Sequence, residues 1–333
     1  MRAITLNLDK PTGISLEEVS LPDLKPHEVK VQLKAAALNH RDEWCRQGRY
    51  PNISNGVVLG SDGAGIVVEV GSDVESSWLG KEVIINAATF WGEDQKVQSK
   101  DFQILGMPSN GTLAEYVHVE ASRLCEKPSH LSFEEAASLP LAGLTAYRAC
   151  FYHGQLQPGM TVLVTGIGGG VAQFAAQFAV TAGAEVYVSS SDKAKINRAK
   201  DFGVKEGFDY KNESWIEDAL SQTGGMDLIV DSAMGDTLPD LIKLLKPGGK
   251  LVFYGATLGN PPMLDARRIF WNQLTLQGTT MGSDQDFKDM VTFVNEEKIT
   301  PLVDSVRPLE KSLEAFELMK AGKQTGKLVV KID

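Results

Sequence analysis

A glycine-rich turn is the clearest chemical feature of the amino-acid sequence. Residues 165–172 read Thr-Gly-Ile-Gly-Gly-Gly-Val-Ala, after a β-type run at 161–165 and before a run with helical spacing at 171–180. Glycine allows a tight turn with positive φ, and the missing Cβ lets a phosphate approach the amides of a helix N-terminus. The pattern predicts a dinucleotide-binding turn, and the alternative is a plain tight turn. Its candidate residues are Gly166, Gly168, Gly169, Gly170 and Val171.

The end of the next expected strand, at 185–188, indicates which dinucleotide would bind. It is followed by three serines, Ser189, Ser190 and Ser191, and then by Asp192 at the start of a helix. An Asp or Glu at the strand end would accept the ribose 2′-hydroxyl of NAD, whereas serine hydroxyls beside lysine and arginine suit a 2′-phosphate. The nearby cations are Lys193, Lys195 and Arg198. We therefore predict a preference for NADP(H); alternatively, these residues only cap the helix and expose its charged face.

The pattern of predicted secondary structure changes near residue 125. Before it, short β-type runs closed by proline and glycine predict a small, mostly β domain. After it, strands and helices alternate, which predicts parallel β-α-β units. The expected strands are 29–33, 65–70, 83–85, 114–119, 161–165, 185–188, 226–230, 250–254, 274–278 and 327–332. The expected helices are 171–180, 192–202, 238–245, 287–297 and 312–321.

Composition narrows the class of protein. The chain has 333 residues, enough for about two domains, and 43% of its side chains are hydrophobic, which argues against disorder or a disulfide-stapled miniprotein. Its net charge of −10 argues against nucleic acid or an anionic membrane as the main partner. Cys45, Cys125 and Cys150 are too far apart in sequence for a disulfide framework or a thiolate metal cluster. We therefore expect a cytoplasmic protein with no membrane span.

Several further segments, taken in order, carry a family resemblance. They are Asn39-His40-Arg41-Asp42, Arg46-x-Gly48-x-Tyr50-Pro51, Leu59–Gly65, Gly143–Tyr147, the glycine-rich turn, Leu245–Gly249 and Gly326–Val329. Over essentially its whole length the chain resembles the medium-chain dehydrogenase/reductase superfamily, and more closely its zinc-free quinone-oxidoreductase-like branch. The resemblance implies an α/β fold: a Rossmann doubly wound parallel sheet at 126–283, and a GroES-like, mostly β catalytic domain from 1–125 and 284–333. The active site is then expected in the cleft between them.

The resemblance also assigns roles to single residues. Asn39 and Tyr50 would donate hydrogen bonds to the acceptor oxygen, and Thr145, at the start of the central helix, would touch the nicotinamide. Alternatively, Asn39 is only a turn residue, Tyr50 is an aromatic before a proline, and Thr145 is a helix N-terminal residue. Lys195 would meet the 2′-phosphate, beside Ser191 and with Tyr210 as the flanking aromatic. The remaining implied cofactor-binding residues are Gly255, Ala256 and Lys327.

Zinc is where the sequence departs from the alcohol dehydrogenases of this superfamily. Those enzymes carry zinc ligands where this chain has Asn39 or a near neighbour, Ser61 and Ala142, and four cysteines in the lobe that corresponds to 87–109, which has none here. Asn, Ser and Ala cannot supply thiolate and imidazole ligands, so we expect no metal. Asp62 is then expected to be a hydrogen-bonded structural carboxylate in a turn.

Together these features predict a zinc-independent, NADPH-dependent oxidoreductase that transfers hydride to quinones, enones or related activated carbonyls. The partner would be a small-molecule substrate. Three alternatives remain: an alcohol or aldehyde dehydrogenase on the same scaffold, a methyltransferase, and a non-enzymatic NADPH-binding protein. The strand at 274–278 is expected at the edge of its sheet, where pairing across a two-fold axis would give a homodimer.

Overall fold

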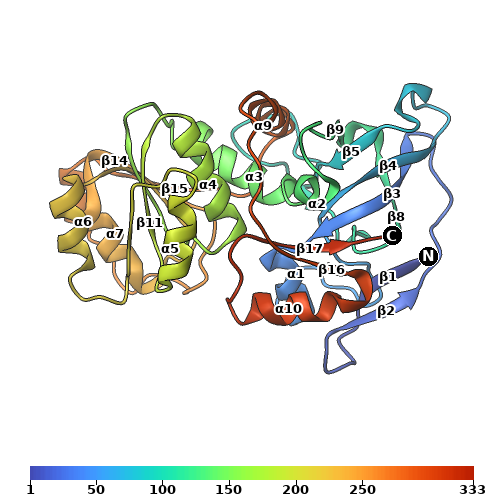
Figure 1. The fold of residues 1–333 in the computed structure, drawn as a ribbon, viewed down its shortest axis with the longest axis horizontal. Helices are drawn as coiled ribbons and strands as arrows, with labels where there is room; N and C mark the ends of the chain where they lie inside the picture. Colours follow the sequence, from blue (N-terminus) through green and yellow to red (C-terminus); the bar gives the residue numbers. More distant parts are fainter. The chain divides into compact units, whose positions relative to one another are not determined.

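The structure is a computed structural model that describes residues 1–333. The chain forms two compact units (Figure 1), the first made of Met1–Leu144 with Gly282–Asp333 and the second of Thr145–Met281. We expected the first boundary at 125, and the first unit continues beyond it because α2 (Phe133–Ala137) packs on strands of the first unit. The predicted pair of a mostly β domain and a parallel-sheet Rossmann domain is confirmed.

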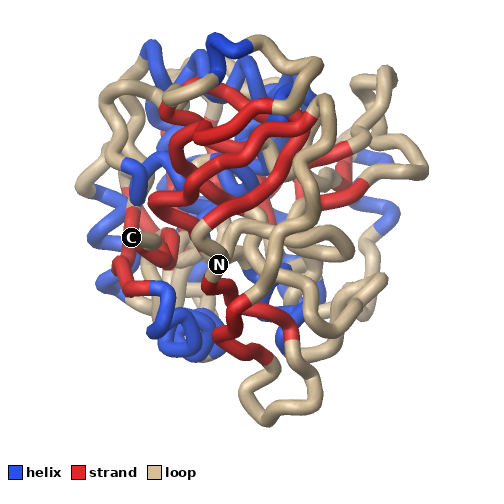
Figure 2. The backbone as a smooth tube through the Cα atoms, turned by 90° about the vertical axis from the view of Figure 1, so that its right-hand side faces the viewer, coloured by secondary structure: helices blue, strands red, loops and turns tan.

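The first unit is organised around a seven-stranded sheet, visible as red strands in Figure 2. The strands run in the order β16-β17-β3-β4-β5-β9, and β8 also pairs with β3. Their bounds are β3 Glu28–Ala37, β4 Asp62–Val70, β5 Glu82–Ile85, β8 Tyr116–Glu120, β9 Leu124–Glu126, β16 Val303–Pro308 and β17 Lys327–Lys331. Two smaller sheets pair β1 (Arg2–Leu6) with β2 (Ile14–Glu18) and β6 (Ala88–Thr89) with β7 (Gln103–Ile104).

The register of this sheet brings distant segments together. Strand β17 is antiparallel to β3 with Val329 opposite Ala37, and β3 is antiparallel to β4 with Ala37 opposite Asp62. The residue two before Val329 therefore reaches the level of the residue two after Ala37. Those residues are Lys327 and Asn39.

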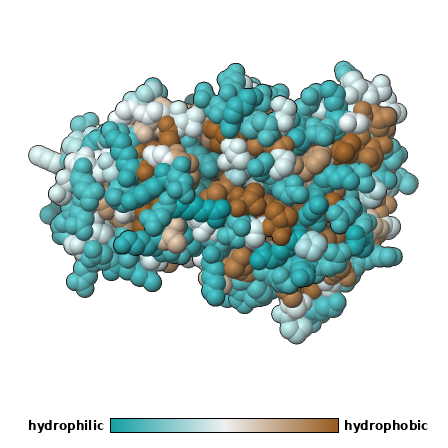
Figure 3. All heavy atoms as spheres, viewed as in Figure 1, coloured by the Kyte–Doolittle hydropathy of each residue, from teal (hydrophilic) through white to brown (hydrophobic).

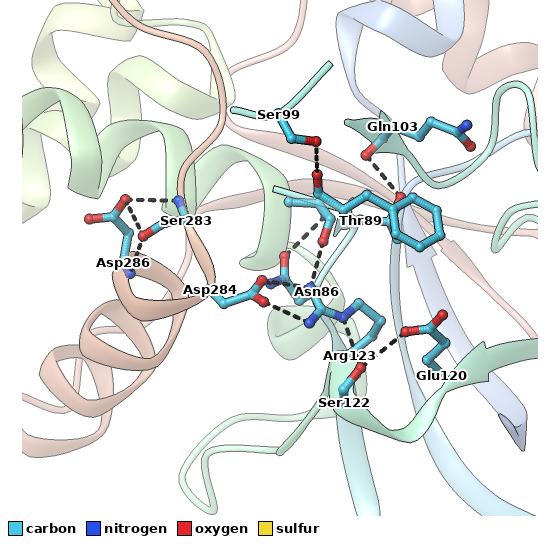
Figure 4. Close-up of polar contacts among 12 residues, drawn as sticks. Asn86, Thr89, Ser99, Gln103, Glu120, Ser122, Arg123, Ser283, Asp284 and Asp286 are labelled. Atoms are coloured by element: carbon cyan, nitrogen blue, oxygen red, sulfur yellow. Dashed lines mark hydrogen bonds and ion pairs between the residues drawn. The ribbon is translucent and has the colours of Figure 1, made fainter. Parts of the chain in front are cut away.

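Five helices involve the first unit. They are α1 His40–Arg46, α2 Phe133–Ala137, α3 Pro140–Tyr147, whose last residues belong to the second unit, α9 Asp284–Glu296 and α10 Ser312–Lys320. Helix α9 begins at a capping box in which Ser283 and Asp286 exchange hydrogen bonds (Figure 4). The last strand of the Rossmann sheet ends at Gly278, and Ser283 caps the helix that follows it.

An ion pair attaches the start of α9 to the β-sheet segments that precede it in sequence. The Arg123 guanidinium donates to both carboxylate oxygens of Asp284 at 2.5 and 2.7 Å, and Asn86 donates to the same carboxylate (Figure 4). Arg123 also donates to the backbone carbonyl of Ala88. This side chain therefore joins three segments of the first unit.

Replacing Arg123 by glutamine is expected to lower the free energy of unfolding by about 1–2 kcal/mol, because bidentate pairs exceed ordinary surface pairs yet Asp284 is partly exposed. The measurement is urea unfolding at neutral pH. Lys81→Gln is the matched control, since its pair with Glu126 is exposed on both sides. Equal losses in the two variants would contradict the expectation.

The second unit contains a six-stranded parallel sheet in the order β12-β11-β10-β13-β14-β15. Its strands are β10 Thr161–Val164, β11 Glu185–Ser189, β12 Glu206–Phe208, β13 Met226–Asp231, β14 Leu245–Phe253 and β15 Thr275–Gly278. Its helices are α4 Gly170–Thr181, α5 Lys193–Lys200, α6 Trp215–Thr223, α7 Leu238–Leu244 and α8 Ala266–Trp271. Figure 1 shows α4 and α5 on one face of the sheet and α6 and α7 on the other.

Hydrophilic residues predominate on the face shown in Figure 3. None of the helices is both long and apolar enough to cross a membrane. Cys45 and Cys150 are buried, Cys125 is partly exposed, and all three are free thiols. Burial raises the pKa of the Cys45 thiol to about 12 and that of Cys150 to about 12, so neither is suited to act as a nucleophile.

Candidate functional site

The glycine-rich turn links β10 to α4 as predicted. Gly166 has a φ of +63°, so it requires the freedom of glycine, and it is the only one of the four glycines with positive φ. A Cβ added at Gly169 would lie 3.6 Å from the carbonyl oxygen of Gly166, which is ordinary contact, so the surrounding protein does not itself exclude a side chain there. No side chain caps the first turn of α4. These features suit a phosphate group that approaches the helix N-terminus from outside.

The end of β11 shows how its polar residues are used. Asp192 is the N-cap of α5, and its carboxylate accepts a hydrogen bond from the amide of Ala194 at 2.9 Å. The amide of Asp192 in turn donates to the hydroxyl of Ser190. The predicted helix N-terminal place of Asp192 is therefore confirmed, and one oxygen of its carboxylate is used in the cap.

Two of the predicted cofactor residues meet at this strand end. The hydroxyls of Ser191 and Tyr210 lie 3.1 Å apart, and both side chains are exposed. Lys195 lies in the first turn of α5 and is partly exposed. Ser191 and Tyr210 thus lie together beyond the carboxyl end of β11, and Lys195 lies in the first turn of the helix that follows.

The side chain of Asp231 links the carboxyl ends of β10 and β13. Its buried carboxylate accepts from the hydroxyl of Thr165 at 2.5 Å and from the amide of Met234 at 2.7 Å. Gly255 follows β14, and a Cβ there would lie only 3.0 Å from the carbonyl oxygen of Ser232. The neighbouring Ala256 is exposed. The predicted backbone positions therefore lie just beyond the carboxyl edge, where open α/β sheets bind ligands.

We expected Thr145 at the start of its helix, but the structure places it near the end. Helix α3 begins at Pro140, because proline suits the first helical position, and Thr145 lies in its last turn. Its side chain is buried, with its hydroxyl 3.9 Å from the sulfur of Met281. Its interpretation as a helix N-terminal residue is therefore wrong.

In the first unit, three polar side chains form a buried ring of hydrogen bonds. Lys327 Nζ donates to Asn39 Oδ1 at 2.7 Å and to Asp62 Oδ2 at 2.8 Å, and Asn39 Nδ2 donates to the same Asp62 oxygen at 2.9 Å. The other oxygen of Asp62 accepts from the amide of Leu141 at 2.7 Å. The exposed fractions are 7% for Asn39, 3% for Lys327 and 0% for Asp62.

Asp62 is thus hydrogen-bonded as predicted, but it opens strand β4 and pairs with a lysine instead of sitting in an isolated turn. We refer to Lys327, Asn39 and Asp62 as the lysine ring. Asn39 is the N-cap of α1, and its backbone amide donates to Asp42.

Tyr50 is held by a second buried cation, Arg41. The Nε of Arg41 donates to the phenol oxygen of Tyr50 at 3.3 Å, and the guanidinium lies 4.8 Å from the ring centre. Its terminal nitrogens donate to the hydroxyl of Ser61 and to the carbonyls of Ile104, Leu105 and Met107. Because the phenol oxygen accepts from Arg41, its own hydrogen remains available to another acceptor.

Two ionisable groups near Asn39 have shifted pKa values. Burial raises the pKa of Asp42, which the Arg41 charge opposes. Desolvation lowers the pKa of His40, although its side chain keeps an exposed face, and the Lys327 ammonium lowers this pKa further. Both shifts favour neutral side chains around Asn39.

The residues at the positions expected for zinc ligands do not fit a zinc ion. Asn39 and Asp62 both bind the Lys327 ammonium, and the Ser61 hydroxyl accepts from Arg41 while donating to Leu105. Ala142 offers no ligand atom, and no group of three His, Cys, Asp or Glu side chains is placed to hold a metal. Two cations here would also repel a third.

Sequence reasoning missed the role of Arg41 and the pairing of Asp62 with Lys327, and it assigned Lys327 only to cofactor binding. Arg41 was visible in the Asn-His-Arg-Asp motif, but nothing in the sequence indicated that it would contact Ser61 and Tyr50. The link between Lys327 and Asn39 spans 288 residues, so no local pattern could have revealed it.

Comparisons with known proteins agree with this architecture. The sequence profile of the alcohol dehydrogenase GroES-like domain matches residues 25–129, and that of the zinc-binding dehydrogenases matches residues 170–296. The chain is similar to zinc-type alcohol dehydrogenase-like protein YogA of Leptosphaeria maculans, with 37% identity over 96% of this chain and 94% of that protein. A zinc-type alcohol dehydrogenase-like protein of Schizosaccharomyces pombe is 38% identical over 95% of this chain and 94% of its own.

A solved structure described as an NAD-dependent alcohol dehydrogenase superimposes with a TM-score of 0.94. It is 36% identical, and the alignment covers 100% of both chains.

Proposed function

The chain belongs to the medium-chain dehydrogenase/reductase superfamily, and we propose that it is a zinc-independent, NADPH-dependent reductase of quinones, enones or related activated carbonyls. The observation that carries the proposal is the lysine ring, because an ammonium bonds the carboxylate and amide that could otherwise serve as metal ligands. The bound cofactor would supply a hydride to the acceptor.

The first unit would stabilise the acceptor oxygen. Negative charge collects on this oxygen during reduction, and hydrogen-bond donors aimed at it lower the barrier. We propose that Asn39 Nδ2 and the Tyr50 hydroxyl are these donors. Asn39 keeps one amide hydrogen beyond its bond to Asp62, and the Tyr50 oxygen accepts from Arg41 and so keeps its hydrogen for donation.

Acceptors that are already electrophilic suit this arrangement. Oxidation of an alcohol needs a group that lowers the pKa of its hydroxyl, which zinc commonly does as a Lewis acid. Reduction of a quinone or enone needs chiefly orientation and hydrogen bonds to an oxygen. The proposal therefore places the acceptor among activated carbonyl compounds.

The second unit would hold the cofactor through the glycine-rich turn and the end of β11. We propose that Ser190, Ser191, Lys195 and Tyr210 surround the 2′-phosphate of NADPH. The sequence supports this, because β11 ends in serines where an acid would accept a ribose 2′-hydroxyl, and the first acid after them, Asp192, is the N-cap of α5. The backbone of Gly255 and Ala256 and the side chain of Thr145 are proposed to serve the nicotinamide half.

Replacing Lys195 by alanine is expected to weaken NADPH binding by about 10- to 100-fold, the worth of one charge-assisted hydrogen bond to phosphate. NADH binding is expected to stay unchanged, because NADH has no 2′-phosphate. Titration of intrinsic fluorescence with each dinucleotide measures both constants. Lys200→Ala, further along the same helix, is the control. If wild-type protein binds NADH as tightly as NADPH, the cofactor proposal fails.

An alcohol dehydrogenase is the second candidate, because the similar proteins from Leptosphaeria maculans and Schizosaccharomyces pombe carry that name. The solved relative is also described as NAD-dependent. A panel of quinones, enones, aldehydes and alcohols, followed at the nicotinamide absorbance with both cofactors, separates the candidates. Elemental analysis of the same preparation tests the metal. Alcohol oxidation with stoichiometric zinc would favour the second candidate.

We further propose that the protein forms a homodimer through the open edge of the six-stranded sheet. Strand β15 lies at that edge, as predicted. The chain just before it exposes large apolar side chains, which commonly mark interaction surfaces. Their exposed fractions are 60% for Leu258, 62% for Met263, 52% for Leu264, 67% for Phe270 and 79% for Trp271.

Replacing Trp271 by glutamate is expected to convert the dimer to a monomer, because a charge would be buried without a partner at the interface. Light scattering after size-exclusion chromatography gives the mass of each form. Leu79→Glu, at an exposed apolar residue of the first unit, is expected to leave the dimer intact. A wild-type monomer, or a dimer in both variants, would refute this interface.

A further inference from the structure

We propose that Lys327 and Asp62 are positioning residues that fix the carboxamide of Asn39 in one orientation, with a single amide hydrogen held ready for the acceptor oxygen. This inference rests on the proposed function, since it concerns how one of the two proposed donors is aimed. It assigns Lys327 to the acceptor side of the reaction, in place of the cofactor role that the family resemblance implied.

The orientation follows from the chemistry of the two partners. A lysine ammonium can only donate hydrogen bonds, and an ionised carboxylate can only accept them. Lys327 must therefore face the oxygen of the Asn39 carboxamide and Asp62 must face its nitrogen, as the distances of 2.7 and 2.9 Å show. A reversed amide would set donor against donor and oxygen against oxygen. The two ends of a carboxamide are usually hard to assign, but here the neighbours leave one choice.

The partners are themselves fixed. The second oxygen of Asp62 accepts from the backbone amide of Leu141, and Lys327 closes the ring by donating to Asp62 at 2.8 Å. Lys327 is the first residue of β17, Asp62 is the first residue of β4, and Asn39 follows the end of β3 by two residues. The register of these paired strands therefore fixes the positions of all three. Asp62 is fully buried with both oxygens used, so it can affect a bound acceptor only through its neighbours.

One hydrogen of the Asn39 amide is left without a protein acceptor. The Nδ2 group carries two hydrogens, and the structure gives it a single partner, Asp62. Asn39 is also the most exposed member of the lysine ring. The remaining hydrogen is the one that an acceptor oxygen would receive.

A double-mutant cycle tests whether Asp62 acts through Asn39. Asn39→Ala is expected to lower kcat/KM for the acceptor by about 100-fold, the cost of a missing donor, and Asp62→Asn by about 10- to 100-fold, the cost of a misaimed one. The double variant is expected to be no slower than Asn39→Ala alone, because an amide that is absent cannot be misaimed. The NADPH dissociation constant is expected to stay the same in all three. Rate losses that multiply would overturn the inference.

Conservative and disruptive changes at Lys327 give the second test. Lys327→Arg keeps a donor-only group and is expected to retain more of the rate than Lys327→Met, which has no donor. Thermal unfolding shows that each variant is folded at the assay temperature. Equal rates for these two variants would count against positioning by Lys327.

A side-chain amide spectrum gives a reading that does not depend on turnover. In ¹⁵N-labelled wild-type protein, the Asn39 side-chain amide signals are identified by their loss in Asn39→Asp. The amide proton hydrogen-bonded to Asp62 is expected to exchange slowly with solvent, and faster in Asp62→Asn. Unchanged exchange would overturn the inference. If wild-type protein reduces none of the acceptors but shows this exchange pattern, the proposed function fails and the positioning stands. If wild-type protein reduces an acceptor but the rate losses of the two single variants multiply in the double variant, the proposed function stands and the positioning fails.

Discussion

Replacing Lys327 by methionine is expected to lower the free energy of unfolding by about 3–5 kcal/mol, the usual cost of removing one partner of a buried ion pair. Lys327 and Asp62 are both almost fully buried, with side-chain exposures of 4% and 0%. The variant would leave the Asp62 carboxylate with only the amides of Asn39 and Leu141 as donors. Urea unfolding followed by fluorescence and circular dichroism measures the loss.

Two further variants show whether the charge or the packing is responsible. Lys30→Met removes a lysine whose pair with Glu69 is exposed and 3.7 Å long, and its expected cost is below about 1 kcal/mol. Combining Lys327→Met with Asp62→Asn removes both charges and is expected to restore part of the stability. A double variant less stable than Lys327→Met alone would show that the ion pair is not the cause.

Removing either proposed donor is expected to slow acceptor reduction by about 100-fold, since one donor to a developing oxyanion is commonly worth that much. The variants are Tyr50→Phe, which deletes only a hydroxyl, and Asn39→Ala, which deletes the amide. The expected effect falls on kcat/KM for the acceptor, because the glycine-rich turn that would bind NADPH lies in the other unit. Steady-state rates with the best acceptor of the panel provide the measurement.

Tyr116→Phe is the matched control for this experiment. Tyr116 lies in β8 of the same unit, and its ring contacts Lys30 rather than Arg41. It is expected to react at the wild-type rate. Normal turnover in both Tyr50→Phe and Asn39→Ala would show that other groups hold the acceptor oxygen.

Local sequence patterns predicted the elements that depend on neighbouring residues. The glycine-rich turn, the strand before it and the helix after it were all placed correctly, because residues within a few positions determine them. The cap formed by Asp192 was also predicted from its own surroundings. Strands β12 and β16 and helix α6 are among the elements that the sequence patterns missed. Strand β12 contains only three residues, one of them glycine, which is too few for a periodic signal.

The arrangement of the candidate site depended on contacts between distant segments. Sequence resemblance selected Asn39 and Tyr50, but only the folded chain shows that each lies against a buried cation, Lys327 or Arg41. The helix containing Thr145 likewise began earlier than expected, at Pro140.

Residue types and spacing were enough to predict the class of fold, the glycine-rich turn and the serines at the end of the second strand of the parallel sheet. The surroundings of Asn39 depend on how distant strands align. A one-residue slip between β17 and β3 would turn the Lys327 side chain to the opposite face of the sheet, and no pattern within either strand indicates their alignment.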